Sequence, residues 1–419
     1  MIEKRDIAGL WWFPANPDER WVGTLTLSPK ETPRLHLTVP KGFGFHSPEV
    51  LPTLHGCDQH GKPITLLHLA RSRCSASATL SSLDYTAGYA VLGIEFPDAA
   101  SFQVHSLMFG MQHLYEWGGI SGFARDTVNT VDNETIRYSR PKNQSFVINS
   151  DLSLEIRATR SGHQSFSERQ IKEGLCFAFQ SRQGLNLSQS LDLIHAIRHL
   201  LHFAILDKVF PLWVNAGRSD HGYTLDNRFI PQDIEFWSSM IREPVESESL
   251  ASGWIFQFRD VQSEFGKFIG NWLEYVKKYE EALDCYFGTI YHRLPDSFEH
   301  LCLTQAFDAY HGIKFESHKE QKFEVKIQEI AEANKSHLTG LIDDVSEFAK
   351  TVLENRNYYT HHNPKWKENG RVVSGANLFR LNEKLRLLFQ MCILSDMGIP
   401  SDRFKRLRRQ IATHIVEYT

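Results

Sequence analysis

The spacing of hydrophobic residues divides the chain into two regions with different patterns, and the change lies near residue 255. From Gly23 to about Arg182, apolar and polar positions alternate with a period of two, which is typical of strands with one buried face. The predicted strands cover 24–27, 35–39, 64–69, 89–96, 102–109, 146–156 and 175–180. Glycine and proline separate them, so we expect an antiparallel sandwich or a barrel-like sheet.

A helix is predicted after the last of these strands. An apolar stripe at helical spacing runs from Leu191 to Ile205 and indicates a helix from Ser188 to about Lys208, with Ser188 as a plausible N-cap. The segment 211–252 has a mixed pattern, and its acidic stretch 243–248 is interpreted as a possible linker.

Helical periodicity dominates from about Arg259 onward, where glycine and proline become sparse. The predicted helices cover about 260–292, 296–314, 320–334, 338–363, 374–397 and 401–418. The sequence therefore predicts an α+β protein. Residues 1–255 form an N-terminal antiparallel β-rich domain with a trailing helix near 188–208, and residues 256–419 form a C-terminal all-α helical bundle.

Composition narrows the class of protein. The 419 residues are 42% hydrophobic and 23% charged, with a formal net charge of −4, which indicates an ordinary globular protein and excludes a basic nucleic-acid coat. The six cysteines include no CxxC pair, as expected for reduced thiols. No apolar run approaches the about 20 residues of a spanning helix, and no signal peptide is evident. We expect a cytoplasmic protein without membrane association.

Most signatures of cofactor or metal chemistry are absent. The sequence contains no phosphate-binding loop, no GxGxxG, no HExxH and no GxSxG motif. His195, His199 and His202 lie on one face of the predicted helix, where two of them could bind one metal ion. The alternative is a polar helix face that happens to carry histidines. Because no acidic or cysteine partner lies at ligand spacing, we expect no metal and no cofactor.

The most informative segment is Glu354–Pro364, late in a predicted amphipathic helix. Arg356 and His361 are five positions apart, about 140° around a helix, whereas Asn357 and His361 share a face. Arg356 therefore has to reach sideways, or the helix has to loosen before Pro364. Alone, an Arg-x4-His spacing is weak evidence of function, because it occurs by chance in many proteins and fits a solvated helix end with a histidine near its C-terminus.

The segment Arg356-Asn357-Tyr358-Tyr359-Thr360-His361 resembles the Arg-x4–6-His motif of the HEPN family, in particular the Apea-like branch found in anti-phage abortive-infection proteins. The predicted helix containing Thr304–His311 resembles the family helix that carries an acid ahead of a Tyr-His pair, with Asp308 where the family usually has Glu. The N-terminal half resembles the β-rich domain that precedes HEPN in these proteins, at Gly9-Leu10-Trp11-Trp12, Gly23-Thr24-Leu25, the Gly88–Phe96 strand and Leu114-Tyr115-Glu116-Trp117.

This resemblance implies a metal-independent endoribonuclease of abortive infection, with tRNA as the favoured substrate and a homodimer that pairs two motifs. His361 would move the proton of a ribose 2′-hydroxyl, Arg356 would bind phosphate oxygens, and Asn357 would hold the histidine or the phosphate. Asp308 would orient Arg356 or fix the histidine tautomer. We expect residues 1–250 to sense a phage-derived trigger or to restrain the nuclease.

Basic residues follow the motif directly. Between Lys365 and Arg409 the sequence has 11 Lys and Arg against 4 Asp and Glu, a net charge of +7. This charge fits an RNA-facing surface, and it fits equally a set of basic residues on the exposed faces of the last two helices. The candidate RNA-binding residues are Lys365, Lys367, Arg371, Tyr359 and His362. The main alternative is a non-catalytic module whose β-rich half binds a ligand or protein and whose helical bundle only dimerises.

Overall fold

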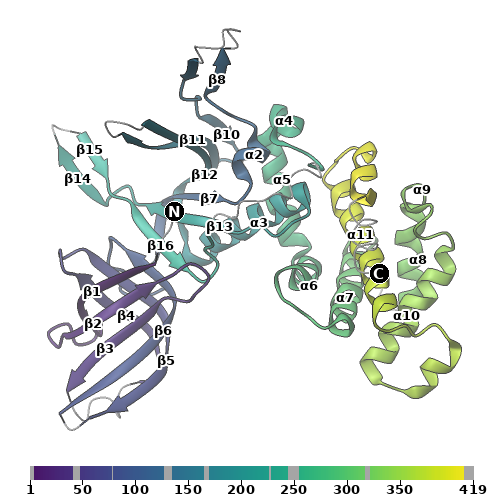
Figure 1. Cartoon of the computed structure of the whole chain (residues 1–419), viewed down its shortest axis with the longest axis horizontal. Helices are drawn as coiled ribbons and strands as arrows, with labels where there is room; N and C mark the ends of the chain where they lie inside the picture. The colour runs from purple at the N-terminus through teal and green to yellow at the C-terminus, as the bar shows by residue number, and fades with distance from the viewer. Residues whose placement is uncertain are drawn as a thin grey trace. The chain divides into compact units, whose positions relative to one another are not determined.

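The computed structural model describes residues 4–40, 48–77, 79–126, 135–164, 169–225, 228–243, 254–316 and 321–409. Strands occupy the N-terminal part and helices the C-terminal part, which confirms the predicted fold class (Figure 1). The chain forms two compact units. The β unit comprises residues 1–198, 209–246 and 265–267, and the helical unit comprises residues 199–208, 247–264 and 268–419. The division predicted at residue 255 stays a prediction.

Six antiparallel strands at the start of the β unit close into a barrel (Figure 1). They are β1 (Arg5–Trp12), β2 (Trp21–Leu27), β3 (Arg34–Pro40), β4 (Val50–Asp58), β5 (Pro63–Ala76) and β6 (Leu80–Leu92). The pairing order is β6-β3-β2-β1-β4-β5, and β5 pairs again with β6. Closure removes the free edges that an open sheet would expose.

The barrel core explains why β4 contains glycine. Trp11 of β1 is fully buried, and its indole lies so close to Gly56 of β4 that a Cβ there would collide with the ring. Leu25, Leu37 and Leu54 are also completely buried or nearly so around the same core. The sequence pattern predicts turns around Gly56, because the Gly and Pro residues of this region mask the strand pattern of β4. β1 was likewise absent from the predicted strands.

The sheet continues beyond the barrel because β6 also pairs with β16. The order is then β16-β13-β7-β12-β11-β10, all antiparallel, with β16 (Ile234–Ser238), β13 (Pro211–Gly217), β7 (Gln103–Met111), β12 (Arg169–Asn186), β11 (Leu152–Gln164) and β10 (Gln144–Val147). The predicted single strand 146–156 is two strands, since the Asn149 side chain accepts hydrogen bonds from two backbone N–H groups and closes a turn between them. The predicted linker 243–248 lies outside the described residues except for Glu243.

Smaller elements complete the β unit. They are the pairs β8 (Phe123–Asp126) with β9 (Thr135–Tyr138) and β14 (Gly222–Leu225) with β15 (Arg228–Pro231), and the helix α2 (Leu114–Gly118).

Helix α3 (Leu187–Ile205) follows β12 as predicted, but its cap differs. The side chains of Asn186 and Gln189 each accept the other's backbone N–H, at 2.9 Å, which is a capping box one turn long. Asn186, not Ser188, therefore caps α3. Residues of α3 up to Arg198 belong to the β unit, and those from His199 belong to the helical unit.

The C-terminal half contains α4 (Phe258–Val261), α5 (Phe265–Lys278), α6 (Glu280–Tyr291), α7 (Asp296–Lys314), α8 (Phe323–Ala333), α9 (Lys335–Leu338), α10 (Val345–His361) and α11 (Ala376–Asp396), with 3₁₀ turns η2 (Gln262–Glu264), η3 (Pro364–Asn369) and η4 (Ser401–Arg403). α7 has the predicted bounds. The helix predicted over 260–292 is interrupted, and α5 and α6 meet at Tyr279. Among the described residues, no helix is long and apolar enough to cross a membrane.

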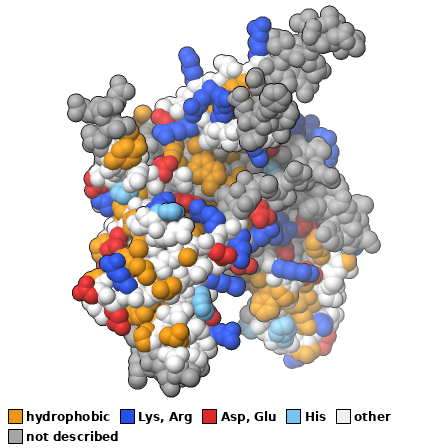
Figure 2. Space-filling view, turned by 60° about the vertical axis from the view of Figure 1, so that its left-hand side comes forward, with side chains coloured by type: hydrophobic (Ala, Val, Ile, Leu, Met, Phe, Trp, Pro, Cys, Tyr) orange, Lys and Arg blue, Asp and Glu red, His pale blue; other side chains and the backbone are white. Residues whose placement is uncertain are grey.

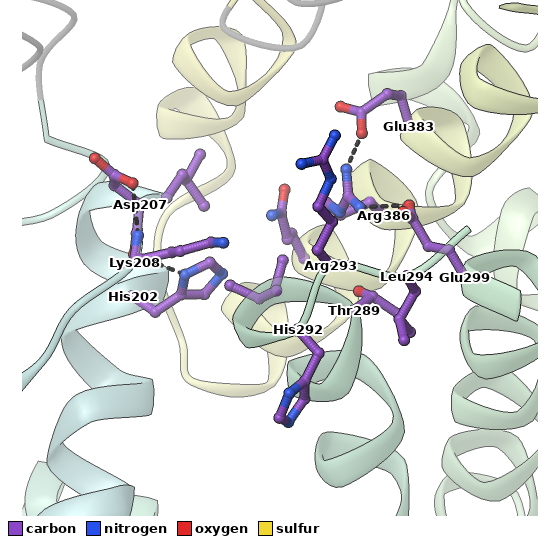
Figure 3. Close-up of a pocket in the computed structure, with 13 residues that line it drawn as sticks. His202, Asp207, Lys208, Thr289, His292, Arg293, Leu294, Glu299, Glu383 and Arg386 are labelled. Atoms are coloured by element: carbon purple, nitrogen blue, oxygen red, sulfur yellow. Dashed lines mark hydrogen bonds and ion pairs between the residues drawn. The ribbon is translucent and has the colours of Figure 1, made fainter. Parts of the chain in front are cut away.

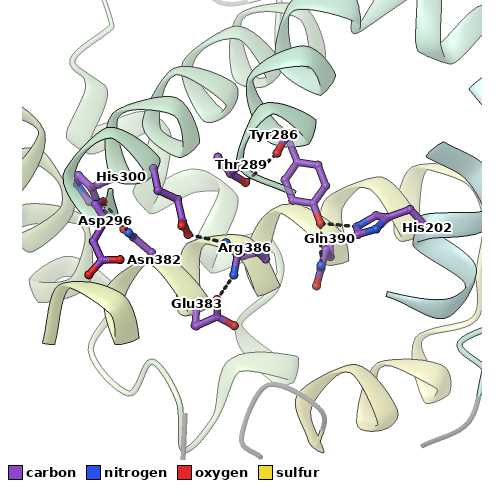
Figure 4. Close-up of polar contacts among 10 residues, drawn as sticks. His202, Tyr286, Thr289, Asp296, His300, Asn382, Glu383, Arg386 and Gln390 are labelled. Carbon is purple, nitrogen blue, oxygen red and sulfur yellow. Dashed lines mark hydrogen bonds and ion pairs between the residues drawn. The ribbon is translucent and has the colours of Figure 1, made fainter. Parts of the chain in front are cut away.

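Helix α7 is central in the helical unit and packs on α6, α8, α10 and α11. A buried polar contact fixes three of these helices. His300 of α7 is fully buried, its Nδ1 lies 2.9 Å from Asn382 Oδ1 of α11, and its Nε2 lies 3.4 Å from the Val352 carbonyl oxygen of α10 (Figure 4). Burial lowers the pKa of His300, which favours the neutral ring in this packing.

Candidate active site

The Arg-His motif lies in the last two turns of α10. The helix begins after Asp344, whose carboxylate accepts the Glu347 backbone N–H at 2.9 Å. It stays helical through His361 and ends at His362, which has a left-handed conformation (φ 49°) and donates its N–H to the Tyr358 carbonyl. The helix therefore does not loosen before Pro364. Arg356 has to reach its partners sideways from a regular helix.

Asp308 of α7 reaches Arg356. Arg356 Nη2 lies 3.6 Å from Asp308 Oδ2, and the guanidinium lies over the Phe323 ring, 4.5 Å from its centre. An ion pair and a stacking contact together limit the rotamers of a planar guanidinium. The shorter Asp side chain therefore does not prevent contact with the motif.

Lys326 of α8 completes the group and was missed in the sequence. Its Nζ donates to Asp308 Oδ1 at 2.7 Å, and its side chain is only 11% exposed. One feature of the sequence could have identified Lys326 as a buried residue. It stands three residues after Phe323 and next to Ile327, on the apolar face of the helix. Two cations around one carboxylate leave a net charge of +1, which suits a phosphate group.

His361 is placed differently from this group. It is exposed, and within the part of the chain that the structure describes no hydrogen bond or ion pair joins its side chain to Arg356, Asn357 or Asp308. Asn357 is half-buried. Asp308 thus contacts Arg356 and not His361. This arrangement fits a carboxylate that orients the arginine, and not one that fixes the tautomer of the histidine. One chain assembles the arginine part of the motif and leaves the imidazole at the surface.

The candidate RNA-binding residues have unequal surroundings. Lys365 and His362 are exposed, and Lys367 lies over the Tyr358 ring, 4.9 Å from its centre. The Tyr359 hydroxyl donates to the Val373 carbonyl at 2.6 Å, and burial raises the pKa of Tyr359. Tyr359 therefore supports the chain after α10, while the two lysines remain accessible.

Arg371 forms ion pairs with two glutamates of α10. Its guanidinium lies 2.7 Å from Glu347 Oε1 and 3.1 Å from Glu354 Oε1. The fully buried Asn355 side chain donates to the Arg371 carbonyl and accepts the Val373 N–H at 2.9 Å. These bonds hold segment 371–373 against α10.

The basic C-terminal stretch offers less free charge than its sequence indicates. Arg386 pairs with Glu299 and Glu383, Arg403 lies 3.2 Å from Asp260, and the guanidinium groups of Arg406 and Arg408 donate to backbone carbonyls. On the face drawn in Figure 2, Lys and Arg side chains lie interspersed with Asp and Glu. Lys365 and Lys367, which directly follow the motif in the sequence, are exposed.

The three histidines of α3 are engaged in packing. His199 stacks on Phe287 with ring centres 3.6 Å apart, and His202 contacts the Asp207 carbonyl and the Tyr286 hydroxyl. Burial and the neighbouring Arg198 lower the pKa of His195 to about 4. Among the described residues, no group of three or more His, Cys, Asp or Glu side chains could hold a metal ion.

Comparison with protein families agrees with this architecture. Residues 6–272 match the model of ApeA N-terminal domain 1, and residues 301–403 match the model of the Apea-like HEPN domain, which includes Asp308, Lys326, Arg356 and His361. No curated protein and no solved structure matches significantly. The first match alone spans more than half of the chain, so the chain belongs to the ApeA-like HEPN family of anti-phage proteins.

Proposed function

We propose that this protein is a metal-independent endoribonuclease of abortive infection that cleaves host or phage RNA, with tRNA as the favoured substrate. The observation that carries the proposal is the pre-positioned Arg356, held by Asp308 and stacked on Phe323 at the surface of the HEPN bundle. A structural arginine could be fully enclosed, whereas this side chain is 30% exposed and can still meet a phosphate.

The proposed reaction is transesterification within the RNA. His361 takes the proton of a 2′-hydroxyl, and the 2′-oxygen forms a bond to the adjacent phosphorus. The bond from phosphorus to the 5′-oxygen breaks, and an acid protonates that oxygen. Arg356 stabilises the charge that develops on the non-bridging oxygens. The products are a 2′,3′-cyclic phosphate and a 5′-hydroxyl, and DNA is not a substrate because it lacks the 2′-hydroxyl.

A homodimer supplies the second proton-transfer group. One chain has a single His361 and one Arg356, and the imidazole is exposed with no partner among the described residues. We propose that a two-fold axis brings two motifs together, so that one His361 acts as base and the second copy acts as acid. Lys365 and Lys367 would attract the RNA backbone next to this composite site.

The β-rich half is assigned a regulatory role in this proposal. An unrestrained ribonuclease would damage its own cell, so residues 1–250 would restrain the nuclease until a phage-derived trigger binds. Expression of the chain with and without phage infection tests this point, because RNA cleavage should appear only after infection.

Paired histidine variants test the catalytic proposal. His361→Ala should lower RNA cleavage by about 10²–10⁴-fold, since it removes the acid-base group, whereas the adjacent His362→Ala should retain most activity. Cleavage should persist in EDTA, and the new 5′ ends should accept phosphate from a polynucleotide kinase without prior phosphatase treatment. Equal behaviour of wild type and His361→Ala, in RNA cleavage and in phage protection, would favour the non-catalytic binding module instead.

A further inference from the structure

The helical unit contains a polar cavity that shares no residue with the Arg-His motif. Its volume is about 420 Å³, within the usual range for small-molecule sites. It is formed by the end of α3, the end of α6, the start of α7 and the middle of α11 (Figure 3). All of these segments belong to the helical unit.

Two cations at the cavity lack counter-ions. Lys208 and Arg293 are both exposed, and neither has an ion pair within the described ranges. Figure 3 shows Lys208 extending from the end of α3 toward the side of the cavity where Arg293 lies. An ammonium and a guanidinium without partners are a suitable pair of donors for a phosphate group. The acids of the lining have other contacts, because Glu299 and Glu383 pair with Arg386 and Asp207 accepts the Lys208 N–H.

A buried acceptor on the lining has no donor. The Asp207 carbonyl can only accept, so His202 donates from Nδ1. With Nδ1–H as its one N–H group, the ring accepts at Nε2 from the Tyr286 hydroxyl at 3.0 Å. Tyr286 can then only accept from Gln390, whose Nε2 lies 2.7 Å away (Figure 4). These three hydrogen bonds fix the orientation of the Gln390 amide. Its Oε1 is left without a partner, although the residue is only 3% exposed. An unpaired buried acceptor is unfavourable unless a ligand or a water molecule in the cavity supplies a donor.

Part of the wall is apolar and is formed by Leu206, Ile290 and Leu294, and Thr289 and His292 complete the lining. The cavity thus combines two free cations, an apolar surface and an acceptor that needs an N–H or O–H group. A nucleotide carries a phosphate, a flat ring face and ring amino or imino groups. We propose that this cavity binds a free nucleotide, with the phosphate at Lys208 and Arg293 and a donor of the base at Gln390. This site goes beyond the proposed ribonuclease function and does not depend on it.

Calorimetric titration of the full-length chain tests the proposal, with AMP, ADP, ATP, GMP, GTP, CTP, UTP and cyclic AMP as probes. At least one should bind saturably with one site per chain. Lys208→Ala/Arg293→Ala should weaken that binding by about tenfold or more, because it removes charge-assisted hydrogen bonds. The control variant Lys277→Ala/Lys405→Ala removes two exposed cations that do not line the cavity and should bind as wild type.

Further titrations separate the parts of the site. The nucleoside without phosphate should bind more weakly than the nucleotide, and Gln390→Met should reduce the difference in affinity between bases. The proposal would be overturned if no nucleotide bound with a dissociation constant below about 1 mM. It would also be overturned if Lys208→Ala/Arg293→Ala and the control Lys277→Ala/Lys405→Ala bound the nucleotide with equal affinity. Binding of an RNA oligonucleotide that is lost in the cavity variant, with no binding of free nucleotides, would also overturn it.

Discussion

Replacing Asp308 by asparagine tests how the motif arginine is held. Lys326 Nζ lies 2.7 Å from this carboxylate and is 11% exposed, whereas Arg356 lies at 3.6 Å and is 30% exposed. A hydrogen bond to a charged group contributes about 1.5–3 kcal/mol, and an exposed ion pair about 0–1 kcal/mol. We expect Asp308→Asn to lower the free energy of unfolding by about 1.5–3 kcal/mol, mainly through Lys326.

A double-mutant cycle isolates this contribution. Asp308→Asn, Lys326→Met and the double variant are compared by urea unfolding of the full-length chain, followed through the circular dichroism of the helices. The expected coupling energy between Asp308 and Lys326 is about 1–3 kcal/mol. The corresponding cycle with Arg356→Gln should give less than about 1 kcal/mol, because that pair is longer and more exposed.

The pair Glu332 and Lys335 provides a matched control in the same unit. It is also an acid–lysine pair, at 3.1 Å, but its side chains are 45% and 59% exposed. Its coupling should be about 0.3–0.5 kcal/mol. If the Asp308–Lys326 coupling is no larger than this control value, Lys326 does not hold the carboxylate and the account of Arg356 positioning is wrong.

Three further predictions concern stability and are read from urea unfolding of the full-length chain. Asn355→Ala should cost about 2–3 kcal/mol and speed proteolysis of segment 364–373, because it leaves the partly buried Val373 N–H without its acceptor and the Arg371 carbonyl without its donor; unchanged proteolysis would contradict this. Gly56→Ala should cost about 1–3 kcal/mol, since its Cβ meets the Trp11 indole; a neutral effect would refute that close packing. His195 binds a proton below about pH 6.5 when unfolded but only below about pH 4 when folded, so stability should fall as pH drops through this window, by at most about 3 kcal/mol. The His195→Phe variant should show a correspondingly smaller fall between pH 7 and pH 4.

The sequence predicted the elements whose periodicity is uninterrupted. The apolar stripe of α3 and the bounds of α7 were readable because α3 contains no glycine or proline and α7 contains only Gly312, in its last turn. β4 was missed because Gly56 is needed for contact with Trp11 and not for a turn. The break at Tyr279 was missed because the residues on both sides of it continue the helical spacing.

The candidate site was predictable only in part. Arg356, His361 and Asp308 could be named from spacing and resemblance, but the contact between α7 and α10 is a tertiary fact that one sequence does not contain. Lys326 illustrates the limit, since a lysine in an amphipathic helix is normally expected at the surface. Arg371 and Arg386 illustrate the reverse, because net charge along the sequence does not reveal which cations are already paired.

The division of α3 between the two units determines how the protein can be truncated. Phe203 stacks on Tyr286 with ring centres 5.7 Å apart, and His199 covers Phe287. A fragment starting at residue 256 would therefore expose these aromatic rings to water, even though it contains the whole segment that matches HEPN. A minimal nuclease fragment has to retain the second half of α3, and aggregation of shorter fragments would reflect this missing helix, not a defect of the catalytic motif.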